Sequence, residues 1–446
     1  MKIKCKDLSY EEVMKLPRAE HKDPKRPSGF YRKLVQTLSR GELKKVHFTF
    51  ENHGMERLGA EEPCLILMNH SSFIDLKIAE TIFKDRPLNI ICTSDGFVGK
   101  EGLLRNIGCV PTQKFVSDTT LIKDMVYCLR TLKDSVLLFP EASYSFDGTA
   151  TPLPQSLGKC LKLLKVSVVM VRTHGAFLRD PLYNGLQVRD VPVSADVTYL
   201  LSPEEIAAKP VEELNDILRE AFTFDNWEEQ RRLGIKVREP FRADGLNRVL
   251  FQCAHCGLLG QMKGSGTRIS CGGCGTEWEL MKDGDLYRIP TEAEKASKAE
   301  EPETEMFFSL KKEFRSVPEW YAWERQKVRE EILADQYRLE IPVEIRMMVD
   351  MKSIYRVGEG TLVHTPKGFH LTGCDGKLDY RQAPEESYSL YADYYWYEIG
   401  DMICIGNRDA LYYCFPKNGE DVVARTRMAA EEMYQIALSK KHNLGG

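Results

Sequence analysis

No apolar run in this sequence is long enough to cross a bilayer. The longest runs are CLILM at 64–68, SVLLF at 135–139 and VSVVMV at 166–171, whereas a transmembrane helix needs about 20 apolar residues. The N-terminus also lacks the apolar stretch of a secretory signal peptide. These absences predict a cytoplasmic protein that is free in solution or peripheral to a membrane.

The chain also lacks a strong net charge and a disulfide framework. Its formal net charge is −4 over 446 residues, which argues against a nucleic-acid-binding polycation and against an acidic disordered protein. Four of its 13 cysteines cluster at 253–274 and the others are scattered singly, as free cysteines are in a reducing compartment. With 43% hydrophobic residues, the chain has material for about two to four domains.

Basic residues are concentrated at the N-terminus. Residues 1–50 contain 13 Lys and Arg against 6 Asp and Glu. We interpret residues 1–27 as a basic arm that either meets an anionic membrane surface or is a solvated tail. Ser9 followed by Glu12 is a capping-box pattern, which predicts one short helix in this arm.

A second helix is expected from residue 28 onward. Its apolar residues fall on one face, and its basic residues lie elsewhere. It is either an interfacial membrane helix or an amphipathic helix that packs on its own domain. The apolar face consists of Phe30, Tyr31, Leu34, Val35 and Leu38.

Strands and helices alternate up to about residue 225. This alternation predicts an α/β domain over residues 28–225, with a mainly buried mixed or parallel sheet. The expected strands are KVHFTFENH, CLILMN, LNIICTS, SVLLFP, VSVVMVRTHG and SADVTYLLS, and the expected helices include TLIKDMVYCLRTLKDS, LGKCLKLLK and PVEELNDILREAF.

The cysteine cluster predicts a metal site in a zinc-ribbon-like domain over residues 246–290. Two C-x2-C pairs are separated by fourteen residues, and Gly257 and Gly275 permit the tight turn after each pair. Four thiolates suit a closed structural Zn²⁺ site. RVLFQC and TRISC are expected to be its flanking strands. The predicted ligands are Cys253, Cys256, Cys271 and Cys274.

The C-terminal part of the chain predicts a β-rich domain. Residues 291–338 are expected to be an acidic linker followed by a helix that begins near Val317. From residue 339, short runs with Gly, Asp and Asn turns predict about seven strands, and a final helix closes the chain. This order resembles the pleckstrin-homology (PH) superfold, so residues 339–446 are expected to form a PH-like barrel with a C-terminal helix.

A histidine and an aspartate follow the apolar run at 64–68 in the stretch NHSSFID. Functional side chains of α/β folds gather at such strand ends. His70 is placed to act as a general base, and Asp75 is placed to orient it and stabilise its charged form. No G-x-S-x-G nucleophile elbow accompanies them, which favours direct transfer to an acceptor hydroxyl.

Four blocks of the sequence resemble the PlsC-like glycerolipid acyltransferase family. NHSSFID resembles its N-H-x4-D signature, FPEASYS its FPEGTRS block, KEGLLRNIGCVPTQK its second block and VSVVMVRTHG its fourth. The resemblance implies transfer of an acyl chain from acyl-CoA or acyl carrier protein to a lysophosphatidic-acid-like lipid in phospholipid biosynthesis, at a peripheral membrane surface. His70 and Asp75 would be catalytic. The substrate-binding residues would be Asn69, Lys100, Lys114, Glu141, Ser143, Tyr144 and Arg172.

The third block departs from the family pattern at Tyr144, where the family has an arginine that helps to hold the acceptor phosphate. Loss of an arginine removes a bidentate phosphate clamp. A non-phosphate lipid acceptor is therefore one alternative, and a degenerate acyltransferase acting as a membrane or protein adaptor is another. The zinc ribbon has only Lys263 and Arg268 as cations between its cysteine pairs, which argues against nucleic acid as a partner.

Overall fold

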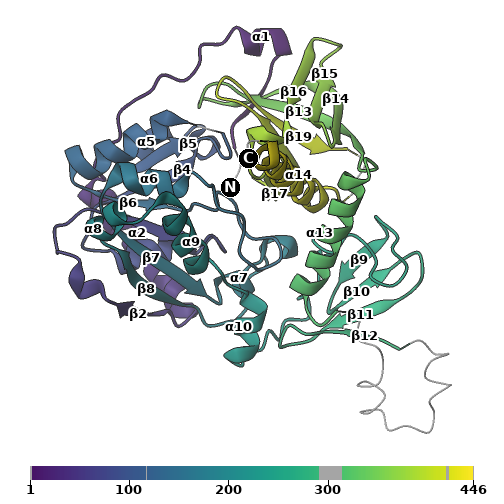
Figure 1. The fold of residues 1–446 in the computed structure, drawn as a ribbon, viewed down its shortest axis with the longest axis horizontal. Helices are drawn as coiled ribbons and strands as arrows, with labels where there is room; N and C mark the ends of the chain where they lie inside the picture. The colour runs from purple at the N-terminus through teal and green to yellow at the C-terminus, as the bar shows by residue number, and fades with distance from the viewer. Residues whose placement is uncertain (1–2, 117, 291–313, 418–420, 445–446) are drawn as a thin grey trace.

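The computed structural model describes residues 3–116, 118–290, 314–417 and 421–444. They form an α/β domain, a C-terminal β domain and a small four-stranded module (Figure 1). Helix α13 (Val317–Leu333) runs from the small module to the C-terminal domain, and it ends before the expected position near residue 338. The predicted linker at 291–305 lies outside the described residues.

The α/β domain contains a seven-stranded sheet in the order β2-β8-β7-β3-β6-β4-β5. All neighbouring pairs are parallel except β7 and β8, which are antiparallel. The predicted mixed sheet is therefore confirmed. The strands are β2 (Thr49–His53), β3 (Cys64–Met68), β4 (Leu88–Thr93), β5 (Cys109–Thr112), β6 (Ser135–Leu138), β7 (Ser167–His174) and β8 (Ser194–Leu201).

Helices cover both faces of this sheet. In β3, Ile66 and Met68 pack into one hydrophobic core while Leu65 and Leu67 pack into another. Such burial on both faces explains the continuous apolar run that the sequence shows. The helices are α2 (Gly29–Lys45), α3 (Asp75–Ile82), α4 (Glu101–Ile107), α5 (Thr119–Val126), α6 (Leu157–Leu164), α8 (Pro203–Ala208), α9 (Val211–Ala221) and α10 (Asn226–Arg232).

The N-terminal arm is packed on the protein and is not a free solvated tail. Its strand β1 (Cys5–Asp7) pairs in parallel with β14 of the C-terminal domain. The predicted short helix is present as α1 (Tyr10–Met14), with the Ser9 capping box. Val13 is buried, and Arg356 pairs with Asp7 at 2.7 Å. The arm thus links the two large domains (Figure 1).

The small module is an antiparallel sheet in the order β12-β11-β10-β9. The expected strand RVLFQC is wrong: residues 246–248 form a 3-10 helix, and within the run only Gln252 pairs, in an isolated bridge with Leu259. Two side chains of α13 take the neighbouring backbone groups: Glu324 accepts from the Gln252 amide at 2.7 Å, and Trp320 donates to the Gln252 carbonyl at 2.9 Å. The strands are β9 (Met262–Ser265), β10 (Arg268–Cys271), β11 (Glu277–Leu280) and β12 (Leu286–Arg288).

The C-terminal domain has strands in the order β16-β15-β14-β13-β19-β18-β17, followed by α14 (Val423–Leu444). The β-rich domain with a closing helix is confirmed. Among the described ladders none joins the end strands β16 and β17, and the PH-like barrel stays a prediction. The strands are β13 (Leu339–Met348), β14 (Ile354–Thr365), β15 (Gly368–Gly373), β16 (Leu378–Gln382), β17 (Tyr391–Trp396), β18 (Gly400–Gly406) and β19 (Leu411–Pro416).

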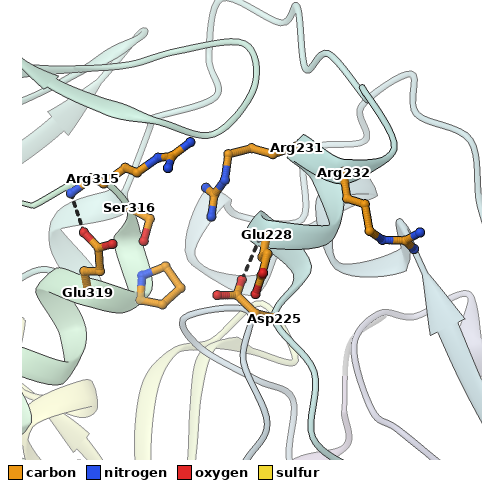
Figure 2. Close-up of a pocket in the computed structure, with 8 residues that line it drawn as sticks. Asp225, Glu228, Arg231, Arg232, Arg315, Ser316 and Glu319 are labelled. Carbon is orange, nitrogen blue, oxygen red and sulfur yellow. Dashed lines mark hydrogen bonds between the residues drawn. The ribbon is translucent and has the colours of Figure 1, made fainter. Parts of the chain in front are cut away.

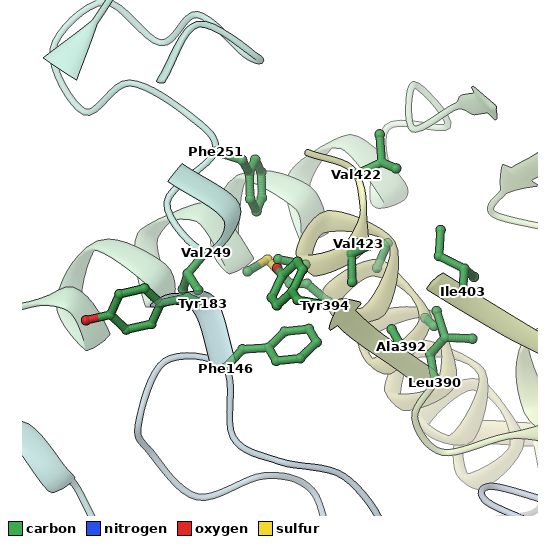
Figure 3. Close-up of a cluster of buried hydrophobic side chains, with 14 of the residues drawn as sticks. Phe146, Tyr183, Val249, Phe251, Leu390, Ala392, Tyr394, Ile403, Val422 and Val423 are labelled. Carbon is green, nitrogen blue, oxygen red and sulfur yellow. The ribbon is translucent and has the colours of Figure 1, made fainter. Parts of the chain in front are cut away.

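One hydrophobic core joins all three parts of the molecule. Figure 3 shows Phe146 of the α/β domain, Val249 and Phe251 of the small module and Tyr394 of β17 in the same cluster. The Phe146 and Tyr394 rings lie 4.9 Å apart, and the Tyr394 hydroxyl donates to the Arg248 carbonyl at 2.6 Å. The C-terminal domain is therefore packed directly against the α/β domain.

Candidate active site

His70 lies in the loop between β3 and α3, and Asp75 is the first residue of α3. His70 Nδ1 lies 3.1 Å from Asp75 Oδ2. The same Asp75 oxygen accepts from the backbone amides of Ser71 and Ser72 at 2.8 and 3.0 Å. A carboxylate held in this way favours the tautomer in which Nδ1 carries the proton, and Nε2 then has a lone pair that can accept a proton.

The His70 ring lies against two aromatic rings. Its centroid is 4.3 Å from that of Phe139 and 4.0 Å from that of Tyr144. Burial lowers the pKa of His70, and the nearby Lys114 lowers it further, while the Asp75 carboxylate opposes both effects. The imidazole is therefore neutral near pH 7, as a general base requires.

Glu141 holds the backbone of the loop that carries His70. Its Oε2 accepts from the His70 amide at 2.8 Å, and its Oε1 accepts from the Thr151 amide and hydroxyl at 3.1 and 2.8 Å. Burial raises the pKa of Glu141 to about 7. Both carboxyl oxygens are thus engaged with the protein, which makes Glu141 a positioning residue.

Asn69 ties the end of β3 to β7. Its Oδ1 accepts from the Thr173 amide at 2.8 Å, and its Nδ2 donates to the Ser71 hydroxyl at 3.0 Å. Asn69 is fully buried. Asn69 therefore fixes the start of the loop that carries His70. It does not itself line the cavity.

His70 opens onto a cavity of about 2090 Å³ that lies between the two large domains. One wall comes from the α/β domain and includes Phe73, Lys114 and Tyr144. The other wall comes from α13, β17 and α14. Its residues include Tyr321, Arg325, Tyr388, Tyr391, Asp393, Trp396, Tyr397, Arg427 and Tyr434.

The structure brings only part of the predicted substrate-binding set into this cavity. Lys114 and Tyr144 line it with His70. Ser143 is buried beside it and accepts from Arg427 Nη1 at 3.2 Å. The remaining four residues do not line the cavity: Asn69, Lys100, Glu141 and Arg172.

A smaller pocket of about 490 Å³ lies between α10 and the start of α13 (Figure 2). Several of its charged residues are paired with the protein itself. Arg231 and Arg315 both pair with Asp285, at 3.4 and 3.2 Å. Asp225 caps α10 by accepting from the Trp227 and Glu228 amides. None of the predicted catalytic residues lines this pocket.

Comparison with known proteins agrees with this geometry. Residues 49–179 match the family model described as Acyltransferase. The chain carries an acyltransferase domain. The matched range contains His70, Asp75 and Glu141, and it confirms the resemblance that the motifs indicate. No curated protein sequence matches the chain.

Among solved structures, this chain is similar to the 1-acyl-sn-glycerophosphate (LPA) acyltransferase PlsC from Thermotoga maritima. The two are 16% identical, and the match covers 43% of this chain and 76% of that chain with a TM-score of 0.33.

Sequence reasoning missed the residues that the C-terminal domain adds to the cavity at His70. Arg427 of α14 donates to the Tyr144 carbonyl at 3.0 Å and pairs with Glu431 at 3.1 Å. Asp393 of β17 lines the cavity. The run YSLYADYYWY at 388–397 is a sequence signal for this wall, but its alternating pattern favours core packing over a binding surface.

The four predicted metal ligands are brought together. Their sulfur atoms all lie within 4.8 Å of one another, with Cys253 to Cys274 at 3.7 Å and Cys256 to Cys271 at 3.8 Å. A tetrahedron with Zn–S bonds of about 2.3 Å has S···S edges of about 3.8 Å. Gly257 and Gly275 have φ of 76° and 73°, as the predicted knuckle turns require. The thiolate set therefore fits a structural Zn²⁺ ion.

The acid limb of the pH–rate profile should report His70. If His70 is the general base, the neutral imidazole is the active form, and activity is lost as pH falls through the folded-state pKa. Since that pKa is lowered from its ordinary 6.5, the midpoint of the rise in kcat/KM should lie below pH 6.5. Asp75→Asn should move the midpoint lower still, because the Asp75 charge favours imidazolium. A wild-type midpoint above 6.5 would contradict this electrostatic account.

Proposed function

We propose that this protein transfers an acyl chain from a thioester, carried by CoA or acyl carrier protein, to a hydroxyl of a lipid. The observation that carries the proposal is the His70–Asp75 pair, which opens onto a large cavity with many aromatic residues. A cavity of this size exceeds the range typical of sites for small ligands, and it suits substrates with long acyl chains.

In the proposed reaction, His70 Nε2 removes the proton from the acceptor hydroxyl. The hydroxyl oxygen attacks the thioester carbonyl, the new C–O bond forms, and the C–S bond breaks. The imidazolium returns its proton to the departing thiolate, so the products are an ester and a free thiol. Asp75 holds the tautomer of His70 and stabilises the imidazolium between these steps. No acyl-enzyme is required.

Thiol release tests the proposal. Purified full-length protein is incubated with acyl-CoA or acyl carrier protein, with and without a lipid that bears a free hydroxyl. We expect thiol release that depends on the acceptor and matches ester formation one to one. Equal thiol release with and without every acceptor would mean simple thioester hydrolysis and would overturn acyl transfer.

We also propose that α2 contacts an anionic membrane surface. Phe30, Leu34 and Leu38 lie on one side of α2, and Phe30 and Leu38 are 71% and 69% exposed. Lys33 and Arg40 are exposed on the same helix. An apolar stripe flanked by cations is typical of helices that lie in the interface of an anionic bilayer. No described helix has the length and apolarity of a membrane span.

Phe30→Glu combined with Leu38→Glu should weaken binding to vesicles that contain anionic lipid by at least tenfold, because the pair removes apolar contact and adds negative charge. Vesicle flotation measures this binding. Leu333→Glu is the matched control, since Leu333 is 62% exposed on α13. Unchanged flotation of the α2 double variant would refute the proposed membrane contact.

The other parts of the chain have supporting roles in this proposal. The zinc-ribbon-like segment at 246–290 is a folding element that packs on α13, and residues 339–446 form the PH-like domain that walls the cavity. The remaining boundaries are the arm at 1–27, the acyltransferase domain at 28–225 and the linker and helix at 291–338.

A further inference from the structure

The C-terminal domain contributes the polar end of the cavity. Asp393 lies in β17 at the point where the pairing with β18 becomes irregular. Immediately after it, Tyr395, Tyr397 and Glu398 have φ of 54°, 46° and 65°, a region that bulky residues rarely adopt. All of these residues line the cavity. Backbone strain of this kind is typical of ligand-binding positions.

One carboxylate oxygen of Asp393 lacks a hydrogen-bond donor. Its Oδ1 is buried and has no hydrogen-bond partner in the described part of the chain. The neighbouring carboxylate of Asp95 is different, because it accepts from the Tyr391 hydroxyl at 2.8 Å and lies 3.5 Å from the Tyr397 hydroxyl. A buried acceptor without a partner is costly. A ligand that donates a hydrogen bond would satisfy it.

Lys114 faces the same space from the α/β domain. Its Nζ lies 4.4 Å from the centroid of the Tyr391 ring, and it forms no salt bridge with any residue that the structure describes. The pKa of Asp393 is raised by burial to about 7, and burial lowers the pKa of Lys114. At this end of the cavity, Asp393 therefore offers an acceptor and Lys114 offers a donor.

The charges argue against a phosphate at this end of the cavity. A phosphate dianion would meet the carboxyl group of Asp393, with Asp95 buried just behind Tyr391 and with Lys114 as its cation. Arg427 lines the cavity but already pairs with Glu431 at 3.1 Å and donates to the Tyr144 carbonyl. A hydroxyl group, by contrast, can both donate to Asp393 and accept from Lys114. The aromatic side chains of Tyr391 and Trp396 also line this end of the cavity.

We propose that Asp393 and Lys114, one from each domain, bind the head group of an acceptor lipid that is uncharged and rich in hydroxyls, such as a glycolipid. This inference rests on the proposed acyl transfer and names its acceptor class. It makes the C-terminal domain part of the substrate site and gives Asp393 the role of a specificity-determining residue.

The test uses three acceptors with the same single acyl chain: a glucosyl monoacylglycerol, a monoacylglycerol and a lysophosphatidic acid. We expect the wild-type kcat/KM to be highest for the glucosyl lipid. Asp393→Asn should lower kcat/KM for that lipid by about tenfold or more, mainly through KM, because a charge-assisted hydrogen bond is weakened. It should change the value for lysophosphatidic acid much less. Asp379→Asn, an exposed carboxylate on β16, is the matched control and should behave as wild type.

Equilibrium binding of the same three lipids, followed by the fluorescence of cavity-lining Trp396, separates this inference from the reaction itself. Preferred binding of the glucosyl lipid that weakens in Asp393→Asn supports the inference even if no acyl transfer occurs, and in that case the proposed function alone fails. Tighter binding and faster turnover of lysophosphatidic acid, or glucosyl-lipid binding that Asp393→Asn leaves unchanged, would overturn the inference.

Discussion

Replacing His70 with alanine is expected to lower the rate of acyl transfer by about 10²–10⁴-fold, the usual contribution of a general base. Without the imidazole, the acceptor hydroxyl keeps its proton and is a weak nucleophile. The Asp75 carboxylate does not compensate, because its Oδ2 is held by the Ser71 and Ser72 amides at 2.8 and 3.0 Å. The measurement is kcat under saturating donor and acceptor.

The fold should survive this substitution. The His70 ring packs against Phe139 and Tyr144 at the edge of the cavity and is 17% exposed. Its loss is expected to cost about 1–3 kcal/mol of folding free energy, well below the usual total. His70→Gln keeps more of the packing and should be equally inactive. His53→Ala, at an exposed position on β2, should keep full activity. A folded His70→Ala protein with wild-type turnover would refute the role of His70.

The second large effect is expected at the cysteine cluster. Cys271→Ser should remove zinc from the protein, with the bound amount falling from one ion per chain to none. Cys271 is buried in the core that also contains Trp278 and Trp320, whose rings lie 4.8 Å apart. Metal binding in small zinc modules contributes on the order of 10 kcal/mol to folding. Its loss should therefore unfold the small module and lower the thermal stability of the parts that pack on it.

Metal analysis and thermal unfolding measure these effects. A strong chelator should produce the same destabilisation in the wild-type protein. Cys5→Ser is the control, because Cys5 is exposed on β1, away from the cluster. An unchanged zinc content in Cys271→Ser, or wild-type stability after zinc removal, would show that the four thiolates do not form a structural site.

The sequence predicts those features that depend on local pattern. The β3 strand and the loop with His70 follow from an apolar run that ends at a polar residue, and both lie where expected. The four cysteines come together because each C-x2-C pair is a local turn. The Ser9 capping box predicts α1 for the same reason.

The sequence could not predict features that depend on contacts between distant segments. Asp393 and Arg427 reach the cavity from more than 300 residues beyond His70 in the sequence. No local sequence pattern predicts that these two residues lie near His70. The sequence of residues 249–251 predicts a strand. In the structure, α13 binds the backbone of the adjacent Gln252, and all three residues are buried. Likewise, the basic composition of the N-terminal arm gives no sign of the register that joins Cys5 to Ile354.

The most direct test of the central claim is to follow the acyl chain itself. Wild-type protein is incubated with acyl-CoA or acyl carrier protein and a hydroxyl-bearing lipid, and the lipids and the intact protein are then analysed by mass spectrometry. We predict an acceptor lipid that has gained one acyl group as an ester, while the mass of the protein is unchanged. An acyl group bound to the protein, or free fatty acid with no acylated lipid, would contradict direct transfer to a lipid hydroxyl at His70.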